Sequence, residues 1–168
     1  MGWIDRLFGR REEEAVTLYR AVVARAREPH WYAEGKVADT IDGRFDMIAA
    51  ILSLVLLRLE AEPGTEAAGV ALAERFVDDM DPQLREIGIG DVLVGKHVGR
   101  MMSMLGGRLG AYREGLAAGS IDRALTRNLY RDHPPAPEAL AHVREGLLAL
   151  HHTLAATPAE TLIEGRLP

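Results

Sequence analysis

Three aspartates close together in the sequence are the densest group of side chains that could do chemistry. Asp39, Asp42 and Asp46 are spaced three and four residues apart, and Arg44 lies between the last two. Residues four apart on a helix share a face, so Asp42 and Asp46 could act together. With Lys96, which follows a glycine-bearing segment, these groups suggest general acid–base chemistry or polar recognition of a ligand.

A helix start would explain the same aspartates without any chemistry. Asp39 or Asp42 could accept backbone N–H bonds as an N-cap residue, and Asp46 would then lie near the positive end of the helix dipole. Capping needs only one such residue, and the sequence DTIDGRFD supplies several. Both interpretations therefore stay open at this stage.

Other catalytic and metal-binding signatures are missing from the sequence. The chain has no cysteine, which excludes thiolate nucleophiles, disulfides and cysteine-based metal centres. Its six histidines include no pair at the three- or four-residue spacing that shares a helix face, and we interpret them as scattered side chains. No GxSxG, HExxH, P-loop or GxGxxG motif occurs. We predict no catalytic residue, no metal site and no cofactor.

Composition and periodicity predict an all-α protein. Hydrophobic residues make up 48% of the 168 residues and aromatic residues only 5%, which is typical of an aliphatic helical core. The net charge of -5 gives no general attraction to nucleic acid. No strand-like alternation appears, and we expect a single-domain bundle of about six to seven helices around a buried central helix.

The central helix is predicted over residues 45–59, where apolar residues occupy every face. Its uncharged run, Met47 to Leu57, is well short of the ~20 residues that a membrane span requires. Other helices are expected over residues 12–28, 66–80, 92–118, 120–131 and 138–156, and an ordered loop over residues 30–44. We divide the chain into an arm (1–11), a helical domain (12–156) and a short C-terminal helix with a tail (157–168).

The first residues form a short amphipathic arm. Trp3 and Leu7 are four residues apart, as are Ile4 and Phe8, and Arg6, Arg10 and Arg11 supply positive charge. The pattern is typical of an interfacial anchor that touches a membrane surface or a partner. Docking of the arm on the protein's own core is the alternative.

One face of the expected 92–118 helix is lined by small residues: Gly95, Gly99, Ser103, Gly106 and Gly110. Each glycine inside a helix costs roughly 0.5–1 kcal/mol relative to alanine. Repeating that cost requires a gain, most simply the close approach of another helix. We expect that neighbour to be the protein's own 45–59 helix. A client helix is the alternative. The nearby Met101, Met102 and Met104 would suit it, or they fill the protein's own core.

Two long motifs in the sequence resemble the ubiquinol–cytochrome c chaperone family. The first is the segment from Asp39 to Met47, and the second runs from Met80 through Leu84–Asp91 to Val94–Val98 and Met101. Gly107-Arg108 and Asn128–Arg131 support them. The resemblance covers residues 19–154, with the motifs in the expected order. The bacterial members of this family are similar to a mitochondrial factor that assembles cytochrome b.

The resemblance implies a chaperone, not an enzyme, that holds newly made cytochrome b until it joins its complex. It implies a cytoplasmic protein at the inner membrane, and the mitochondrial partners, a small helical co-chaperone and the ribosome, are further candidates. The runner-up is a small-molecule binder or enzyme that uses Asp42, Arg44, Asp46 and Lys96. Our candidate client-binding residues are Asp39, Asp42, Arg44, Asp46, Gly90, Asp91, Gly95, Lys96, Gly99, Met102, Gly106, Tyr130 and Arg131, and our candidate membrane contacts are Trp3, Ile4, Leu7 and Phe8.

Overall fold

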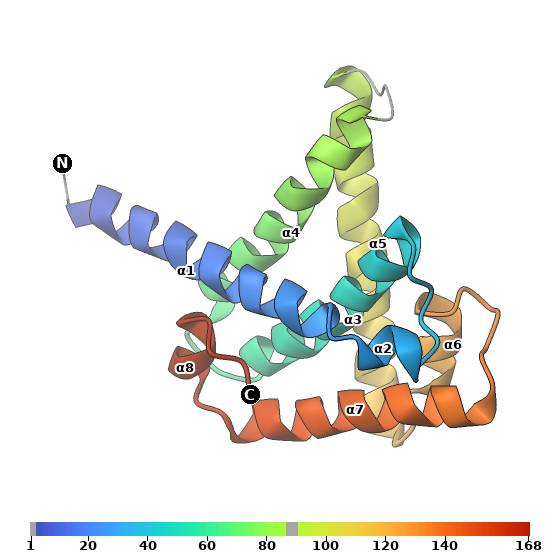
Figure 1. Ribbon diagram of the computed structural model, residues 1–168. Coiled ribbons are helices and arrows are strands. Elements are labelled where there is room, and N and C mark those ends of the chain that lie inside the picture. Colours follow the sequence, from blue (N-terminus) through green and yellow to red (C-terminus); the bar gives the residue numbers. More distant parts are fainter. Residues whose placement is uncertain (1–2, 87–90) are drawn as a thin grey trace.

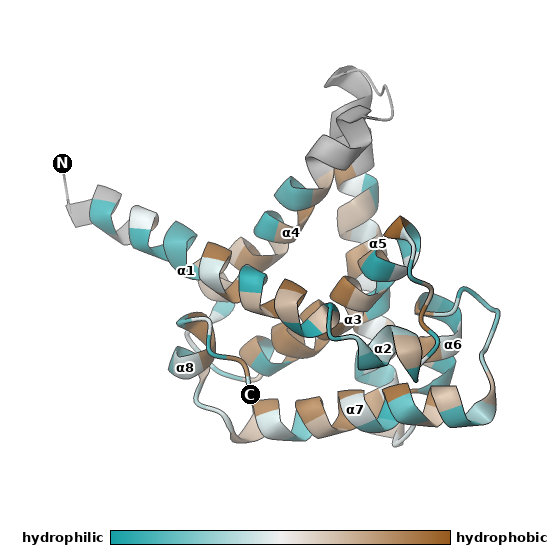
Figure 2. Ribbon diagram, viewed as in Figure 1, coloured by the Kyte–Doolittle hydropathy of each residue, from teal (hydrophilic) through white to brown (hydrophobic). Residues whose placement is uncertain are grey.

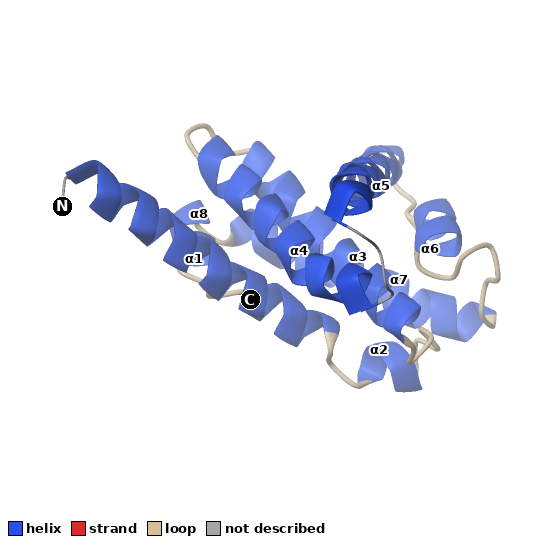
Figure 3. Ribbon diagram, turned by 90° about the horizontal axis from the view of Figure 1, so that it is seen from above, coloured by secondary structure: helices blue, strands red, loops and turns tan. Residues whose placement is uncertain are grey.

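The structure is a computed structural model that describes residues 3–86 and 91–168; of residues 3–5, 7, 81–86 and 91–97 it describes the backbone only. The described residues form helices joined by loops, with no strand among them (Figure 3). The helices are α1 (Trp3–Ala26), α2 (His30–Ala33), α3 (Ile41–Glu60), α4 (Glu66–Glu86), α5 (Asp91–Ala118), α6 (Asp122–Asn128), α7 (Pro137–Ala156) and α8 (Ala159–Ile163). The all-α prediction is confirmed.

Helix α3 is the central element of the fold (Figure 1). It packs against α1, α4, α5 and α7, and every residue from Asp46 to Leu56 is buried. Burial on all sides explains why the sequence shows apolar residues on every face of this helix. The predicted buried central helix is confirmed.

The start of α3 depends on Thr40 and on a close backbone approach at Gly43. The Thr40 hydroxyl accepts a hydrogen bond from the Gly43 amide at 3.1 Å, so Thr40 is the N-cap residue. A Cβ atom at Gly43 would lie 1.9 Å from the carbonyl oxygen of Ala38, a distance that no side chain tolerates. The helix start is therefore capped, as one of the two interpretations proposed, but by Thr40 and not by Asp39 or Asp42.

Two helix starts differ from the sequence prediction. Helix α1 begins at Trp3 rather than at residue 12, because the helical spacing of the arm continues in register and Arg10 Nε pairs with Glu14 Oε1 at 2.9 Å across the expected boundary. The expected loop over residues 30–44 was also wrong, since α2 and the first turn of α3 lie within it. Trp31 explains α2: its ring is buried and its Nε1 donates to the Arg25 carbonyl at 2.9 Å.

Two features of the outer helices are relevant to binding: the extended start of α1 and the divergence of α4 from α5. The N-terminal half of α1 extends away from the body of the protein (Figure 1), and its colouring is mostly hydrophilic until it reaches the core (Figure 2). Helices α4 and α5 both pack on α3 and diverge from each other toward the lower end of Figure 1. No helix in the described part of the chain is both long and apolar enough to cross a membrane.

Candidate functional site

The carboxylate of Asp46 is buried in the second turn of α3 and lies between two arginines. Its Oδ1 accepts a hydrogen bond from Arg108 Nη2 at 2.7 Å. Its Oδ2 accepts one from Arg131 Nε at 2.6 Å. A buried carboxylate is tolerated only when it is paired in this way. Asp46 therefore ties α3 to α5 and to the segment that follows α6.

Arg131 reaches Asp46 because the backbone after α6 turns sharply. Arg131 and Asp132 adopt φ angles of 50° and 63°, a left-handed conformation that costs a non-glycine residue roughly 1–2 kcal/mol. The Asp132 amide donates to the Thr126 carbonyl at 2.9 Å and closes the turn. Arg131 also donates from Nη1 to Asp42 Oδ2 at 3.0 Å. The hydrogen bond to Asp46 raises the pKa of the Arg131 guanidinium above its ordinary value.

Arg108 completes the cluster from the side of α5. Its side chain is only 13% exposed, and the guanidinium carbon lies 5.3 Å from the centre of the Phe45 ring, a favourable cation–π geometry. Its Nε and the hydroxyl of Tyr112, one helical turn later, are buried without a hydrogen-bond partner among the described residues. Burial also raises the pKa of Tyr112. With Asp46 held by two cations, the arrangement is a desolvated ion-pair centre rather than a free acid–base pair.

The remaining residues of the predicted polar site do not join this centre. Arg44 Nε pairs with Asp39 Oδ1 at 2.7 Å, and both side chains are more than half exposed. Such a surface pair contributes little to stability. Gly90 lies outside the described residues, and the structure describes only the backbone of Asp91, Gly95 and Lys96.

Tyr130, another predicted contact residue, is buried. Its hydroxyl donates to the Gly35 carbonyl at 2.6 Å and so holds the loop between α2 and α3. Burial raises the pKa of Tyr130 to about 12. The structure therefore brings Asp42, Asp46 and Arg131 together, adds Arg108, and places Tyr130 in the core.

The glycine-lined side of α5 faces open space. A Cβ atom at Gly99, Gly106 or Gly110 would meet nothing within 4 Å, so the expectation that α3 is the close neighbour of this face was wrong. Helix α5 packs inward through another side, which carries the buried residues Met101, Leu105 and Tyr112 and Arg108. That side is turned about 150° from the glycines at 100° per residue. This inward side buries large side chains against α3, and glycines could not provide that contact.

A groove of about 450 Å³ lies between α4 and α5 over the C-terminal half of α3. The described residues that line it are Leu56, Leu59, Glu60, Thr65, Glu66, Gly69, Val70, Ala73, Glu74, Met102, Leu105, Gly106 and Leu109. Val70 is 58% exposed and Met102 is 42% exposed. Two predicted residues, Met102 and Gly106, thus meet a wall of α4 that the sequence analysis missed. We call this feature the α4–α5 groove.

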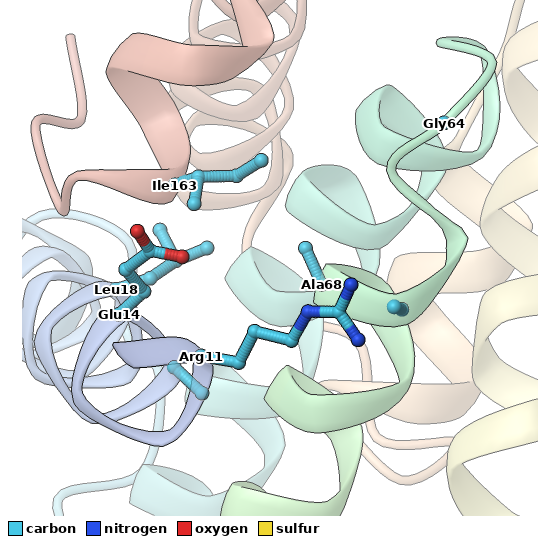
Figure 4. Close-up of a pocket in the computed structure, with 8 residues that line it drawn as sticks. Arg11, Glu14, Leu18, Gly64, Ala68 and Ile163 are labelled. Atoms are coloured by element: carbon cyan, nitrogen blue, oxygen red, sulfur yellow. The ribbon is translucent and has the colours of Figure 1, made fainter. Parts of the chain in front are cut away.

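A smaller cavity, of about 180 Å³, lies where α1, α4 and α8 meet. Figure 4 shows Arg11 extending from α1 toward α4 near Ala68, with Ile163 of α8 on the opposite side. Its lining includes Gly64 and no predicted site residue. The α4–α5 groove is larger and more apolar, and it is the better candidate for a binding site.

Phe8 is the one predicted membrane contact whose side chain is described, and it is 63% exposed. It lines a second groove, of about 460 Å³, between α1 and α4. The side chains of Trp3, Ile4 and Leu7 lie outside the description.

Two of the histidines, which we had interpreted as scattered, meet in the fold. His30 Nδ1 lies 2.9 Å from His142 Nε2, and Glu28 Oε2 lies 3.0 Å from His30 Nε2. The described residues hold no cluster of three or more side chains suited to a metal ion. The pair is 112 residues apart in sequence, and no local spacing could have revealed it.

Comparison with known protein families shows which family the chain belongs to. The profile of the family described as ubiquinol-cytochrome C chaperone matches residues 33–167. The chain belongs to the ubiquinol–cytochrome c chaperone family. The resemblance seen in the two sequence motifs is thereby confirmed.

A solved structure has the same architecture as this chain. The crystal structure of the Cbp3 homolog from Brucella abortus superposes with a TM-score of 0.83 at 33% sequence identity, covering 98% of this chain and 92% of that one. No curated protein matches the sequence. The two proteins therefore share one fold over nearly the whole length of this chain.

Proposed function

We propose that the protein is an assembly chaperone that binds newly made cytochrome b and promotes assembly of the ubiquinol–cytochrome c reductase complex. In this proposal an apolar client helix lies in the α4–α5 groove. The observation that carries it is the exposed apolar lining of that groove, with Val70 on one wall and Met102 on the other. Exposed apolar patches on a soluble domain commonly mark binding sites.

The chemistry of the groove suits a client that is itself a bundle of helices. Methionine adapts its shape to irregular apolar partners. Gly106 at the groove and Gly99 on the adjoining open side have open space at their Cβ positions, so a client backbone could approach α5 closely at these two positions. In our proposal these glycines serve client binding and not packing within the protein.

The polar cluster has a supporting role in this proposal. Asp46, Arg108 and Arg131 fix α5 against α3 and thereby hold the wall of the groove in place. Asp46 lies ~20 Å along α3 from Leu59, at 1.5 Å per residue. Asp39, Asp42 and Arg44 lie at the same distant end, so we propose them as a second contact for a client or co-chaperone that extends along α5.

The enzymatic alternative has less support. General acid–base catalysis needs an available carboxylate in a pocket. Asp46 is occupied by two arginines, Arg44 is paired with Asp39, and none of these residues lines the α4–α5 groove. We therefore propose that the protein is not an enzyme.

A substitution at Gly106 tests the proposal. Gly106→Leu fills the groove, whereas Gly106→Ala adds only a methyl group where nothing lies within 4 Å. We expect the leucine variant to lose cytochrome b in a pull-down from native membranes and the alanine variant to keep it, with both remaining helical by circular dichroism. Gly99→Leu, which we also expect to abolish capture, shows whether the contact extends beyond the groove lining.

Unchanged capture of cytochrome b by Gly106→Leu would exclude the groove as the client site. A residue-specific crosslinker at Gly99 and another at Asp42 would show independently whether each end of the surface touches the client.

A further inference from the structure

We infer that the α4–α5 groove recognises the positively charged flank of a transmembrane segment, that is, the end of an apolar helix that carries lysines or arginines. This inference rests on the proposed function and specifies which part of the client is held. It follows from the charges around the groove and from its length.

The charged residues that line the groove have one sign. Glu60, Glu66 and Glu74 line it, and no basic residue is among the described lining residues. Glu66, Val70 and Glu74 are spaced four residues apart on α4 and so share one face. The wall of α4 therefore presents an exposed valine between two carboxylates, an arrangement that complements an apolar helix with cationic residues at its end.

Two of these carboxylates are suited to accept an incoming cation. Glu60 pairs with Arg113 at 2.6 Å, and both side chains are about half exposed, so exchanging this partner for a client lysine costs little. Glu66 Oε1 accepts a hydrogen bond from the Gly64 amide at 3.3 Å, and backbone hydrogen bonds lower the pKa of Glu66. The lowered pKa favours the charged carboxylate, which is the form that pairs with a cation.

The neighbouring groove between α1 and α4 shares Val70 and Glu74 with the α4–α5 groove and differs in its other charged residues. Its lining carries Arg11 and Arg75 as well as acidic residues, so it has no uniform preference for a cation. The single sign of charge distinguishes the α4–α5 groove as a selective site.

The size of the groove limits what it holds. Glu66 and Glu74 are eight residues apart, about 12 Å along α4. A membrane-spanning helix needs ~20 apolar residues, so the groove accommodates only about its last two turns. Transmembrane segments carry an excess of lysine and arginine in the flanks on their cytoplasmic side. The charge and the length of the groove both match that end of the client.

Peptide binding to the full chain tests the inference. The probes are fluorescent alanine/leucine peptides of about four helical turns, identical except for a flank of three lysines, three serines or three glutamates. By fluorescence anisotropy at low salt we expect the lysine peptide to bind about 10-fold tighter than the serine peptide, since each exposed pair contributes 0.2–1 kcal/mol. The glutamate peptide should bind more weakly than both. In 1 M salt, where the Debye length is about 3 Å, the three affinities should converge.

Charge variants show whether the groove causes the preference. The triple variant Glu60→Gln, Glu66→Gln, Glu74→Gln should bind all three peptides alike. The matched control neutralises three exposed glutamates that do not line the groove, at positions 13, 145 and 160, and should keep the wild-type preference. Circular dichroism confirms that each variant is folded.

The outcomes separate this inference from the proposed function. Equal binding of the three peptides to wild type, or equal loss of preference in the control, overturns the charge inference and leaves the groove as a client site. No binding of any peptide, or full binding to Gly106→Leu, overturns both.

Discussion

Replacing Asp46 by asparagine tests how much the buried ion-pair centre contributes to stability. The change is nearly isosteric and removes only the charge. It leaves Arg108, which is 13% exposed, without an anion in a desolvated site. Removing one partner of a buried ion pair costs about 3–5 kcal/mol. The Arg131 side chain is 48% exposed and regains water, so we expect the lower value, about 3 kcal/mol.

Urea unfolding followed by circular dichroism at the helix band measures this loss. A slope of about 2 kcal/mol per molar urea converts 3 kcal/mol into a midpoint lowered by about 1.5 M. Total stabilities are about 5–15 kcal/mol, so the variant should still fold. Asp42→Asn is the matched control because it removes a carboxylate from the same Arg131, but one that is 73% exposed. We expect it to cost at most about 0.5 kcal/mol.

A midpoint for Asp46→Asn within about 0.3 M urea of wild type would refute the reasoning. The two arginines would then be equally well solvated without their carboxylate, and the centre could not be what fixes α5 against α3.

Three further predictions follow from packing, burial and exposure. Gly146→Ala should destabilise the fold by about 1–2 kcal/mol, because its Cβ would lie 2.8 Å from the Trp31 ring. Gly107→Ala, whose Cβ would meet nothing within 4 Å, should stabilise the fold by about 0.5–1 kcal/mol. Thermal melts in which both variants shift the melting temperature in the same direction would contradict this. The pKa values of all four tyrosines are raised, that of Tyr130 to about 12, above the unfolded value of about 10. Stability should therefore fall from pH 10 upward and phenolate absorbance should appear only with loss of helix; a midpoint near pH 10 with intact helix would argue against buried phenols. Phe8→Ser should reduce flotation with anionic liposomes, as should deletion of residues 1–11; identical flotation of these chains and wild type would remove the arm as a lipid contact.

The helical framework could be predicted because it depends on local patterns. The run from Met47 to Leu57 is apolar at every position, which only a buried central helix explains. Helix α2 could not be predicted in this way, because four residues are too few to show a period. Its formation depends on the burial of Trp31 against Gly146, which lies more than 100 residues away.

The sequence contains a signal of the ion-pair centre. Arg108 shares a helix face with Met101, Leu105 and Tyr112, since these residues follow at spacings of four, three and four. An arginine on an otherwise apolar face must have a buried acidic partner, and Asp46 is the acidic residue that precedes the apolar run of the central helix.

The α4–α5 groove had no such signal. Its shape depends on how far two helices diverge, and neither helix encodes that alone. The glycine pattern on α5 was visible in the sequence, but the cost of those glycines gives no information about which neighbour they face.

The open glycines also set the local stability of α5. Four of them, Gly99, Gly106, Gly107 and Gly110, have no contact at the Cβ position, so together they weaken the helix by roughly 2–4 kcal/mol relative to alanines. Helix α3, buried along most of its length, carries no comparable weakness. Amide hydrogens of α5 should therefore exchange through sub-global openings that leave α3 protected. In the proposed function, a wall of the groove that opens without global unfolding would give a bound client helix a route of release that needs no external energy source.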